Sequence, residues 1–145
     1  MTSSRIRTAA ALCRLLPWFL ALGALKRVVP LHTLARWSWS PARRASRAPD
    51  PARIASTVLR AGALAGVPDR DCLQRSLLLY RELSRAGLGP ELAVGFQRVD
   101  GALAGHAWVT IDGLVVGERD LNPARFAPIL RFGARGALLR EETAG

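Results

Sequence analysis

Cysteine, histidine and lysine are scarce in this chain of 145 residues. It contains two cysteines, two histidines and a single lysine, Lys26. No Cys/His spacing suited to zinc occurs, and we expect no metal and no cofactor. Cys13 and Cys72 lie in segments of very different character, and nothing favours a disulfide between them. We therefore expect reduced thiols in a cytoplasmic protein, with Cys13 as a buried hydrophobic side chain.

Acidic residues are also few, and the net charge is +10. Almost all of the positive charge is arginine, in a chain rich in alanine, glycine and proline, a composition that coding bias alone can produce. No helix carries an arginine/aromatic recognition pattern and no strand has the aromatic pattern of an RNA-binding RNP motif. We therefore expect no nucleic-acid partner. The basic excess can still attract an acidic peptide or a membrane surface.

Half of the residues are hydrophobic, which is enough for the core of one domain. We expect residues 1–50 to form an amphipathic helical segment followed by a Pro/Arg-rich linker. Residues 51–145 are then expected to form the compact core that carries the chemistry.

The apolar stretch over residues 9–37 is open to two interpretations. A basic start and the apolar run from Leu15 to Leu25 are typical of a signal peptide or a membrane anchor. Against this, Arg14 interrupts the apolar residues, and the uninterrupted run is too short to span a bilayer. The pattern favours one or two amphipathic helices, broken near Pro17 and again at Pro30, that pack on the core or on a partner.

A helix is predicted to begin at Cys72 and to end at Gly87. Asp71 is suited to be its N-cap, with Gln74 at the third helical position, an arrangement related to the capping box. We expect Gln74 and Arg75 to be exposed or to form salt bridges. A thiol becomes a nucleophile where its surroundings favour the thiolate and a base lies beside it. The unpaired N–H groups of a helix start supply the first condition.

Two or three strands are predicted after this helix. Apolar residues alternate with small or polar ones around residues 92–97, which indicates a strand. Asp100-Gly101 is a turn signal, and a loop of small residues, 102–105, is expected to lead to a second strand, His106–Ile111. Asp112-Gly113 is typical of the turn that closes a tight hairpin. The tail from Asn122 is expected to be mostly coil.

A cysteine at a helix start, followed by antiparallel strands that carry a histidine, is the arrangement of papain and the transglutaminases. Over about residues 54–120 the chain resembles this transglutaminase-like (papain-like) core. More narrowly, it resembles the lasso-peptide B2 proteins, which are stand-alone leader peptidases. The segments that carry the resemblance are Cys72-Leu73-x-Arg75-Ser76-Leu77, Leu92-Ala93-Val94-Gly95-Phe96, His106-Ala107-Trp108-Val109 and Asp112-Gly113.

The resemblance implies an α+β fold in which the helix with Cys72 packs on a small antiparallel sheet with His106, preceded by N-terminal helices. It implies a cysteine peptidase, a hydrolase that removes the leader from a ribosomally made lasso-peptide precursor. Cys72 would be the nucleophile and His106 the base. The implied partners are the precursor peptide, a small leader-recognition protein of the B1 type, and an asparagine-synthetase-like macrolactam cyclase.

The third catalytic residue of the family is acidic and lies twelve positions after the histidine, which is Glu118 here. A regular two-residue loop at Asp112-Gly113 would place Glu118 on the face of the sheet opposite to His106, because side chains alternate along a strand. We therefore predict an irregularity in this hairpin, such as a bulge at Gly117. Asp120 is the alternative acid.

Other interpretations stay open at this point. Trp108 faces the same side as His106, so it is a candidate substrate-binding residue that covers the site, or else a core residue. The chain can also be a non-catalytic scaffold of the same fold that binds the precursor or the cyclase. A third possibility is a transglutaminase-like acyl transferase, which uses the same thioester chemistry on an amine acceptor.

Overall fold

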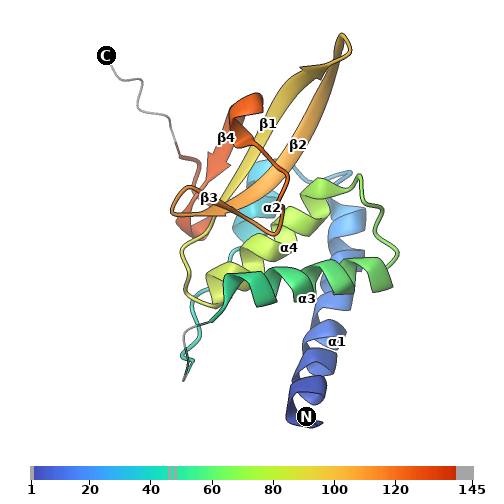
Figure 1. Ribbon diagram of the computed structural model, residues 1–145, viewed down its shortest axis with the longest axis vertical. Coiled ribbons are helices and arrows are strands. Elements are labelled where there is room, and N and C mark those ends of the chain that lie inside the picture. Colours follow the sequence, from blue (N-terminus) through green and yellow to red (C-terminus); the bar gives the residue numbers. More distant parts are fainter. Residues whose placement is uncertain (1, 46, 48, 140–145) are drawn as a thin grey trace.

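The computed structural model describes residues 2–45, 47 and 49–139. Within these residues the chain forms four α-helices and a four-stranded antiparallel sheet (Figure 1). The helices are α1 (Thr2–Leu25), α2 (Leu31–Ser38), α3 (Pro51–Leu64) and α4 (Cys72–Arg85). The strands are β1 (Glu91–Val99), β2 (Ala102–Ile111), β3 (Leu114–Val116) and β4 (Ala127–Phe132), and the 3₁₀ turns η1 (Pro123–Arg125) and η2 (Ala134–Gly136) flank β4.

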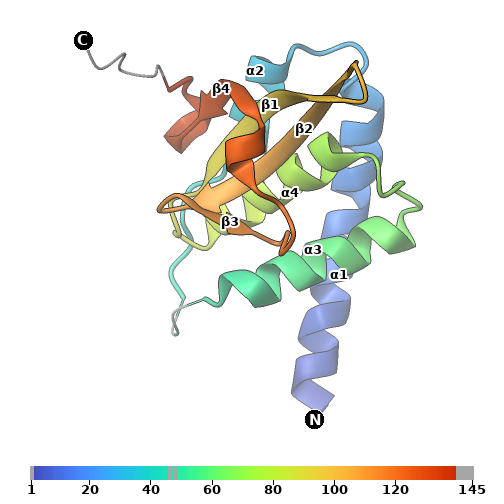
Figure 2. The same cartoon turned by 45° about the horizontal axis from the view of Figure 1, so that its top comes forward.

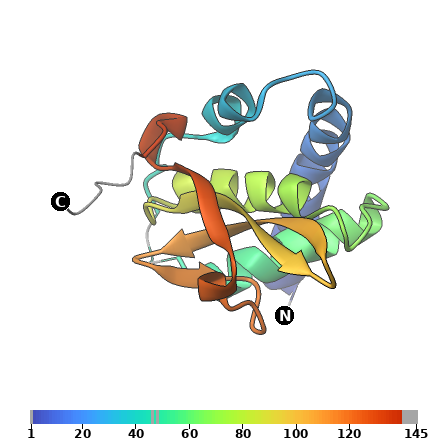
Figure 3. The same ribbon diagram turned by 90° about the horizontal axis from the view of Figure 1, so that it is seen from above.

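Helix α4 lies at the centre of the molecule. It contacts the three other helices and the two middle strands of the sheet, whose order is β3-β2-β1-β4. Figure 3 shows α4 running along the sheet, with α2 on its opposite side. Leu77, Leu78 and Leu83 are completely buried because both sides of the helix are covered. The predicted α+β fold, with the cysteine-bearing helix packed on an antiparallel sheet, is confirmed.

Helix α1 is continuous through Pro17, so the predicted break at that residue is wrong. Proline removes one helical hydrogen bond and favours a kink. Here Leu15, Phe19 and Leu22, on both sides of Pro17, are buried against α3 and α4. Burial of three large side chains outweighs the loss of one hydrogen bond. The break predicted at Pro30 is confirmed, since α2 begins at the next residue.

Cys13 is exposed, so the prediction that it is a buried hydrophobic residue is wrong. It lies two positions from the buried Leu15, which is about 200° around a helix of 3.6 residues per turn. By length and composition alone, the part of α1 from Arg5 to Leu25 is apolar enough to cross a membrane, with a mean hydropathy of 1.6 over its window.

The two segments expected on either side of residue 50 share one hydrophobic core. Leu34 and Ala35 of α2 are buried in the same cluster as the central residues of α4. Between α2 and α3, the described residues form no helix or strand. Asp50 caps α3 by accepting a hydrogen bond from the Ala52 N–H at 3.0 Å.

Tyr80 of α4 ties the end of the sheet to the helices. Its buried hydroxyl donates to the Gly133 carbonyl and accepts from the Gly136 N–H at 2.9 Å. Gly136 has a φ of +66°, and a Cβ there would lie 2.5 Å from the Arg36 backbone nitrogen of α2. Burial raises the pKa of Tyr80 above its usual 10.0.

We expect Tyr80→Phe to lower the free energy of unfolding by about 0.5–1.5 kcal/mol, because the Gly133 carbonyl and the Gly136 N–H each lose a hydrogen bond and keep only the one between them, at 3.2 Å. Chemical denaturation at pH 7 measures this loss. Since the folded-state pKa of Tyr80 is raised, its contribution is complete below the unfolded-state value and is lost as the pH rises above about 10. Stability above that pH should therefore fall less steeply in the variant, and an unchanged slope would contradict this.

The two hairpin turns are formed where predicted, but the second strand begins earlier. Asp100 and Asp112 have φ of +50°, and the glycine after each is also at positive φ, as in the primed turns of tight hairpins. Residues 102–105, expected to be a loop, belong to β2 and pair with the end of β1. Small residues there obscure the alternation that identifies a strand.

The tail expected to be coil contains the edge strand β4, which pairs with β1. The register shifts between Val94 and Gly95, so the pairing is irregular. Pro128 within the strand weakens any strand signal in the sequence, because proline is confined to sheet edges and bulges. Figure 2 shows β4 and η1 beside β1, which brings Phe126 over the sheet.

Candidate active site

Cys72 is the first residue of α4, as predicted, and its thiol is free and partly buried. One helical turn later, the buried Ser76 hydroxyl donates to the Ala107 carbonyl of β2 at 2.9 Å. Residues four apart lie on the same face of a helix, so Cys72 is on the face that meets β2. His106 is adjacent to Ala107. This hydrogen bond therefore holds the start of α4 beside the strand position of His106.

Glu118 lies against His106, with 2.8 Å between its Oε2 and His106 Nε2. The hairpin itself is regular: Val109 pairs with Val116 and Ile111 with Leu114. Strand β3 ends at Val116, and Gly117 follows with a φ of +85°. The predicted irregularity within the hairpin is therefore wrong: the pairing is regular, and it is after the strand, at Gly117, that the chain turns and brings Glu118 to the histidine.

Gly117 is constrained in two ways. Its φ is in the left-handed region, and a Cβ would lie 3.3 Å from the Ala55 Cβ of α3. Asp120, the alternative acid, is exposed, and the polar contact of His106 within the described residues is with Glu118.

We expect Gly117→Ala to lower the free energy of unfolding by about 1–2 kcal/mol, because alanine is strained at positive φ. It should also reduce any activity that depends on Glu118, because the turn that places this residue is disturbed. Gly101→Ala is the matched control: its φ is +79°, but nothing lies within 4 Å of its Cβ position and it is in the other hairpin. Equal loss of activity in both variants would contradict this role of Gly117.

The other nitrogen of His106, Nδ1, is not engaged by Glu118. When Nε2–H donates to the Glu118 carboxylate, Nδ1 of the neutral ring carries a lone pair and can accept a proton. The side chains of His106 and Glu118 are 23% and 32% exposed, so both can be reached from solvent. A histidine bonded to a carboxylate, on a strand packed against a helix that begins with a cysteine, is an arrangement suited to nucleophilic catalysis.

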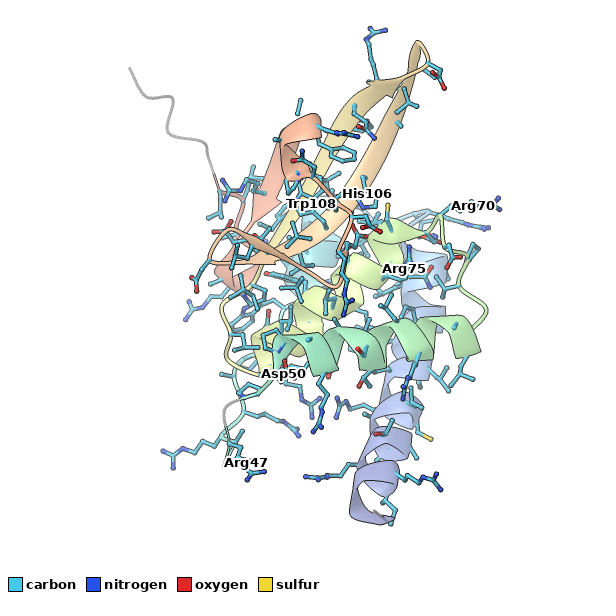
Figure 4. The ribbon with its side chains drawn as sticks, viewed as in Figure 1. Arg47, Asp50, Arg70, Arg75, His106 and Trp108 are labelled. Atoms are coloured by element: carbon cyan, nitrogen blue, oxygen red, sulfur yellow. The ribbon has the colours of Figure 1, made fainter. Side chains whose placement is uncertain are left out.

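Trp108 is only 4% exposed. Its ring is stacked on that of His106, with centroids 6.3 Å apart, and both rings contact Phe126. Figure 4 shows His106 and Trp108 side by side on β2. Gly95 leaves room for these rings, because a Cβ there would lie 3.0 Å from the Trp108 ring. The rings hold His106 from one side while Glu118 holds its Nε2.

Lys26, the only lysine, forms an ion pair with Asp71, the residue before Cys72. Asp71 precedes α4 but makes no side-chain capping hydrogen bond, so the predicted capping box is wrong. Its negative charge, next to the thiol, is neutralised by Lys26. Gln74 is buried rather than exposed, since it donates to the Phe19 carbonyl and lies 3.3 Å from Lys26 Nζ. This network fixes the start of α4 to α1.

Arg75 points from α4 toward the loop before it (Figure 4). It donates to the Asp69 carbonyl and lies 3.8 Å from the Asp69 carboxylate, so it is the salt-bridge residue that the sequence suggested. Together with Glu118 and Trp108, it lines a small cavity of about 90 Å³ between α3, α4 and β3. Among the described residues, no group of three or more His, Cys, Asp or Glu side chains is arranged to hold a metal ion.

The fold and this site define a class of α+β protein. It has a cysteine at the start of a helix, and on a neighbouring strand a histidine that is bonded to a carboxylate. The family model of the transglutaminase-like superfamily matches residues 7–131, and the chain belongs to this superfamily. The match includes α1 and α2, which are therefore part of the family fold. Members of the superfamily are commonly catalytic, as cysteine peptidases or acyl transferases. No curated protein and no solved structure matches the chain significantly.

Proposed function

We propose that the protein is a cysteine peptidase that cleaves the leader from a ribosomally made lasso-peptide precursor. The observation that carries this proposal is the bond between Glu118 and His106 Nε2, which leaves Nδ1 for a thiol at the start of α4. The narrower assignment to leader cleavage rests on the resemblance of the Cys72 and His106 segments to the B2 proteins.

The proposed reaction proceeds through a thioester. His106 Nδ1 accepts the proton of the Cys72 thiol, and Sγ bonds to the carbonyl carbon of the last leader residue. The oxyanion that forms accepts a hydrogen bond from the Cys72 backbone N–H at the helix start. The C–N bond breaks as His106 protonates the leaving amine. Water then attacks the thioester while His106 accepts one of its protons; the C–S bond breaks, the leader acid departs, and His106 passes that proton to the Cys72 thiolate.

The residues around His106 are proposed to orient its ring. Glu118 favours the tautomer with the proton on Nε2 and stabilises the imidazolium that forms during attack. Trp108 and Phe126 restrict the ring from the side away from the carboxylate. The proposed setting is the cytoplasm, with a leader-recognition protein that delivers the precursor and a macrolactam cyclase that acts on the product.

The test is to incubate the protein with a precursor and its recognition protein and to measure the masses of the products. A peptidase gives the leader acid and the free core peptide. An acyl transferase, supplied with a primary amine such as cadaverine, gives instead a leader–amine adduct. Intact precursor, bound but uncut, would identify a scaffold and refute the peptidase proposal.

A further inference from the structure

A basic groove lies on the side of the molecule that the proposed chemistry does not use. It has a volume of about 690 Å³ and lies between the N-terminal half of α1 and α3. Four arginines line it, two from each helix: Arg7, Arg14, Arg53 and Arg60. We call these four residues and the hollow between them the arginine groove. Figure 1 shows the N-terminal half of α1 extending past α3.

The positive charge of the arginine groove is largely uncompensated. Of the two acids in its lining, Glu82 is paired with Arg14 at 2.5 Å, and Asp50 caps α3. Within the part of the chain that the structure describes, neither Arg53 nor Arg60 has a carboxylate oxygen within 4.0 Å. Both side chains are on exposed residues of α3 and are free to meet a ligand.

More cations lie close by on α4 and in the segment before α3. Burial, together with the neighbouring Arg14 and Arg43, lowers the pKa of Arg85. Burial also lowers the pKa of Arg81, and both Arg85 and Arg14 contribute to that shift. These neighbouring arginines, together with the four that line the groove, create a positive potential over this end of the molecule, which attracts an anionic partner.

The lining favours a peptide over other polyanions. It contains no aromatic side chain on which a nucleic-acid base can stack. The arginines converge from two helices on a hollow whose other lining residues include Ala11 and Ile54. Such a shape suits an extended chain with carboxylates at its edges and small apolar side chains between them, rather than a flat layer of lipid headgroups.

The arginine groove lies at a fixed distance from Cys72. Helix α1 carries Arg7 and Arg14 in its first half, and Lys26, bound to the residue before Cys72, follows its last residue. The rise of a helix places these arginines about 18–28 Å from Lys26. An extended peptide covers that distance with about five to eight residues.

We propose that the arginine groove docks an acidic segment of the peptide that is cut at Cys72, about five to eight residues from the cleaved bond. The identity of the peptide rests on the proposed function, whereas binding at the groove does not require cleavage.

Binding is therefore measured with Cys72→Ala protein, by fluorescence anisotropy of a labelled 12-residue peptide of alternating Glu and Ala at about 0.1 M salt, where the Debye length is about 10 Å. The double variant Arg53→Glu/Arg60→Glu should bind this peptide about tenfold or more weakly, because four charge units change at the contact. Arg36→Glu/Arg98→Glu is the matched control, with the same change of net charge at exposed residues of α2 and β1. Its affinity should fall by less than about threefold at a distance beyond the Debye length.

A charge swap separates a binding role from misfolding. The Arg53→Glu/Arg60→Glu protein should gain affinity for a Lys/Ala peptide of the same length, which an unfolded variant cannot do specifically. Equal loss of affinity in the two double variants would overturn the proposal. So would groove-dependent binding of phosphatidylserine vesicles or a single-stranded oligonucleotide with no binding of the Glu/Ala peptide. If the protein binds the peptide but cuts no precursor, the peptidase function is refuted and the proposal of an acidic-peptide site at the arginine groove stands.

Discussion

Cys72→Ala should reduce cleavage of the precursor by about 10⁴-fold or more, because the acyl-enzyme cannot form without the thiol. The substitution removes one atom from a partly buried position at the end of a helix, so the melting temperature should change little. Precursor binding should also persist. Product mass over time, with and without the recognition protein, measures the loss.

Cys13→Ala is the matched control for that variant, because Cys13 is the other free cysteine and lies on the exposed side of α1. It should cleave at the wild-type rate. Alkylation with iodoacetamide gives a second comparison: the Cys13→Ala protein should lose its activity on modification of Cys72. Cleavage that survives Cys72→Ala would refute the assignment of the nucleophile, whatever the activity of the Cys13→Ala variant.

Glu118→Ala should reduce cleavage by roughly 100-fold or more, because His106 loses the partner that fixes its tautomer and stabilises its charged form. Glu118→Gln should lose less, since the amide oxygen can still accept the Nε2–H hydrogen bond while the negative charge is gone. The difference between these two variants measures how much of the effect is electrostatic. Steady-state cleavage rates should show the loss in kcat rather than in KM.

Asp120→Ala is the control for the choice of acid, because Asp120 lies two residues further along and is exposed. Its activity should stay within about twofold of wild type, as for most surface substitutions. A large loss in Asp120→Ala with little effect in Glu118→Ala would reverse the assignment. Near-UV circular dichroism on each variant checks that Trp108, which contacts His106, keeps its environment.

Local sequence patterns were sufficient to predict the helix and the hairpin turns that form the site. The helix beginning at Cys72 was predicted from its apolar spacing and from Gly87, which ends it at a φ of +77°. Both hairpin turns followed from Asp-Gly pairs, which adopt the positive φ that such turns require. These features depend on neighbours in the chain, so the sequence carries them directly.

Other features depend on contacts between distant residues and were predicted wrongly or missed. Helix α1 continues through Pro17 because of burial against α3 and α4, and β4 forms because β1 offers an unpaired edge. Gln74 looked like an exposed residue of a capping box, yet it bonds a carbonyl of α1 55 positions away. Local propensity is a weak guide where tertiary packing opposes it.

The sequence by itself determined which residues carry the chemistry: a cysteine at a helix start, a histidine on a strand, and an acid twelve positions later. Only the tertiary structure decided how they meet. Strand alternation alone would turn Glu118 away from His106, and the left-handed turn at Gly117 reverses this. The charge beside Cys72 is likewise neutralised by Lys26, from the turn after α1. Such pairings are made by packing between segments far apart in the chain, which no local pattern records.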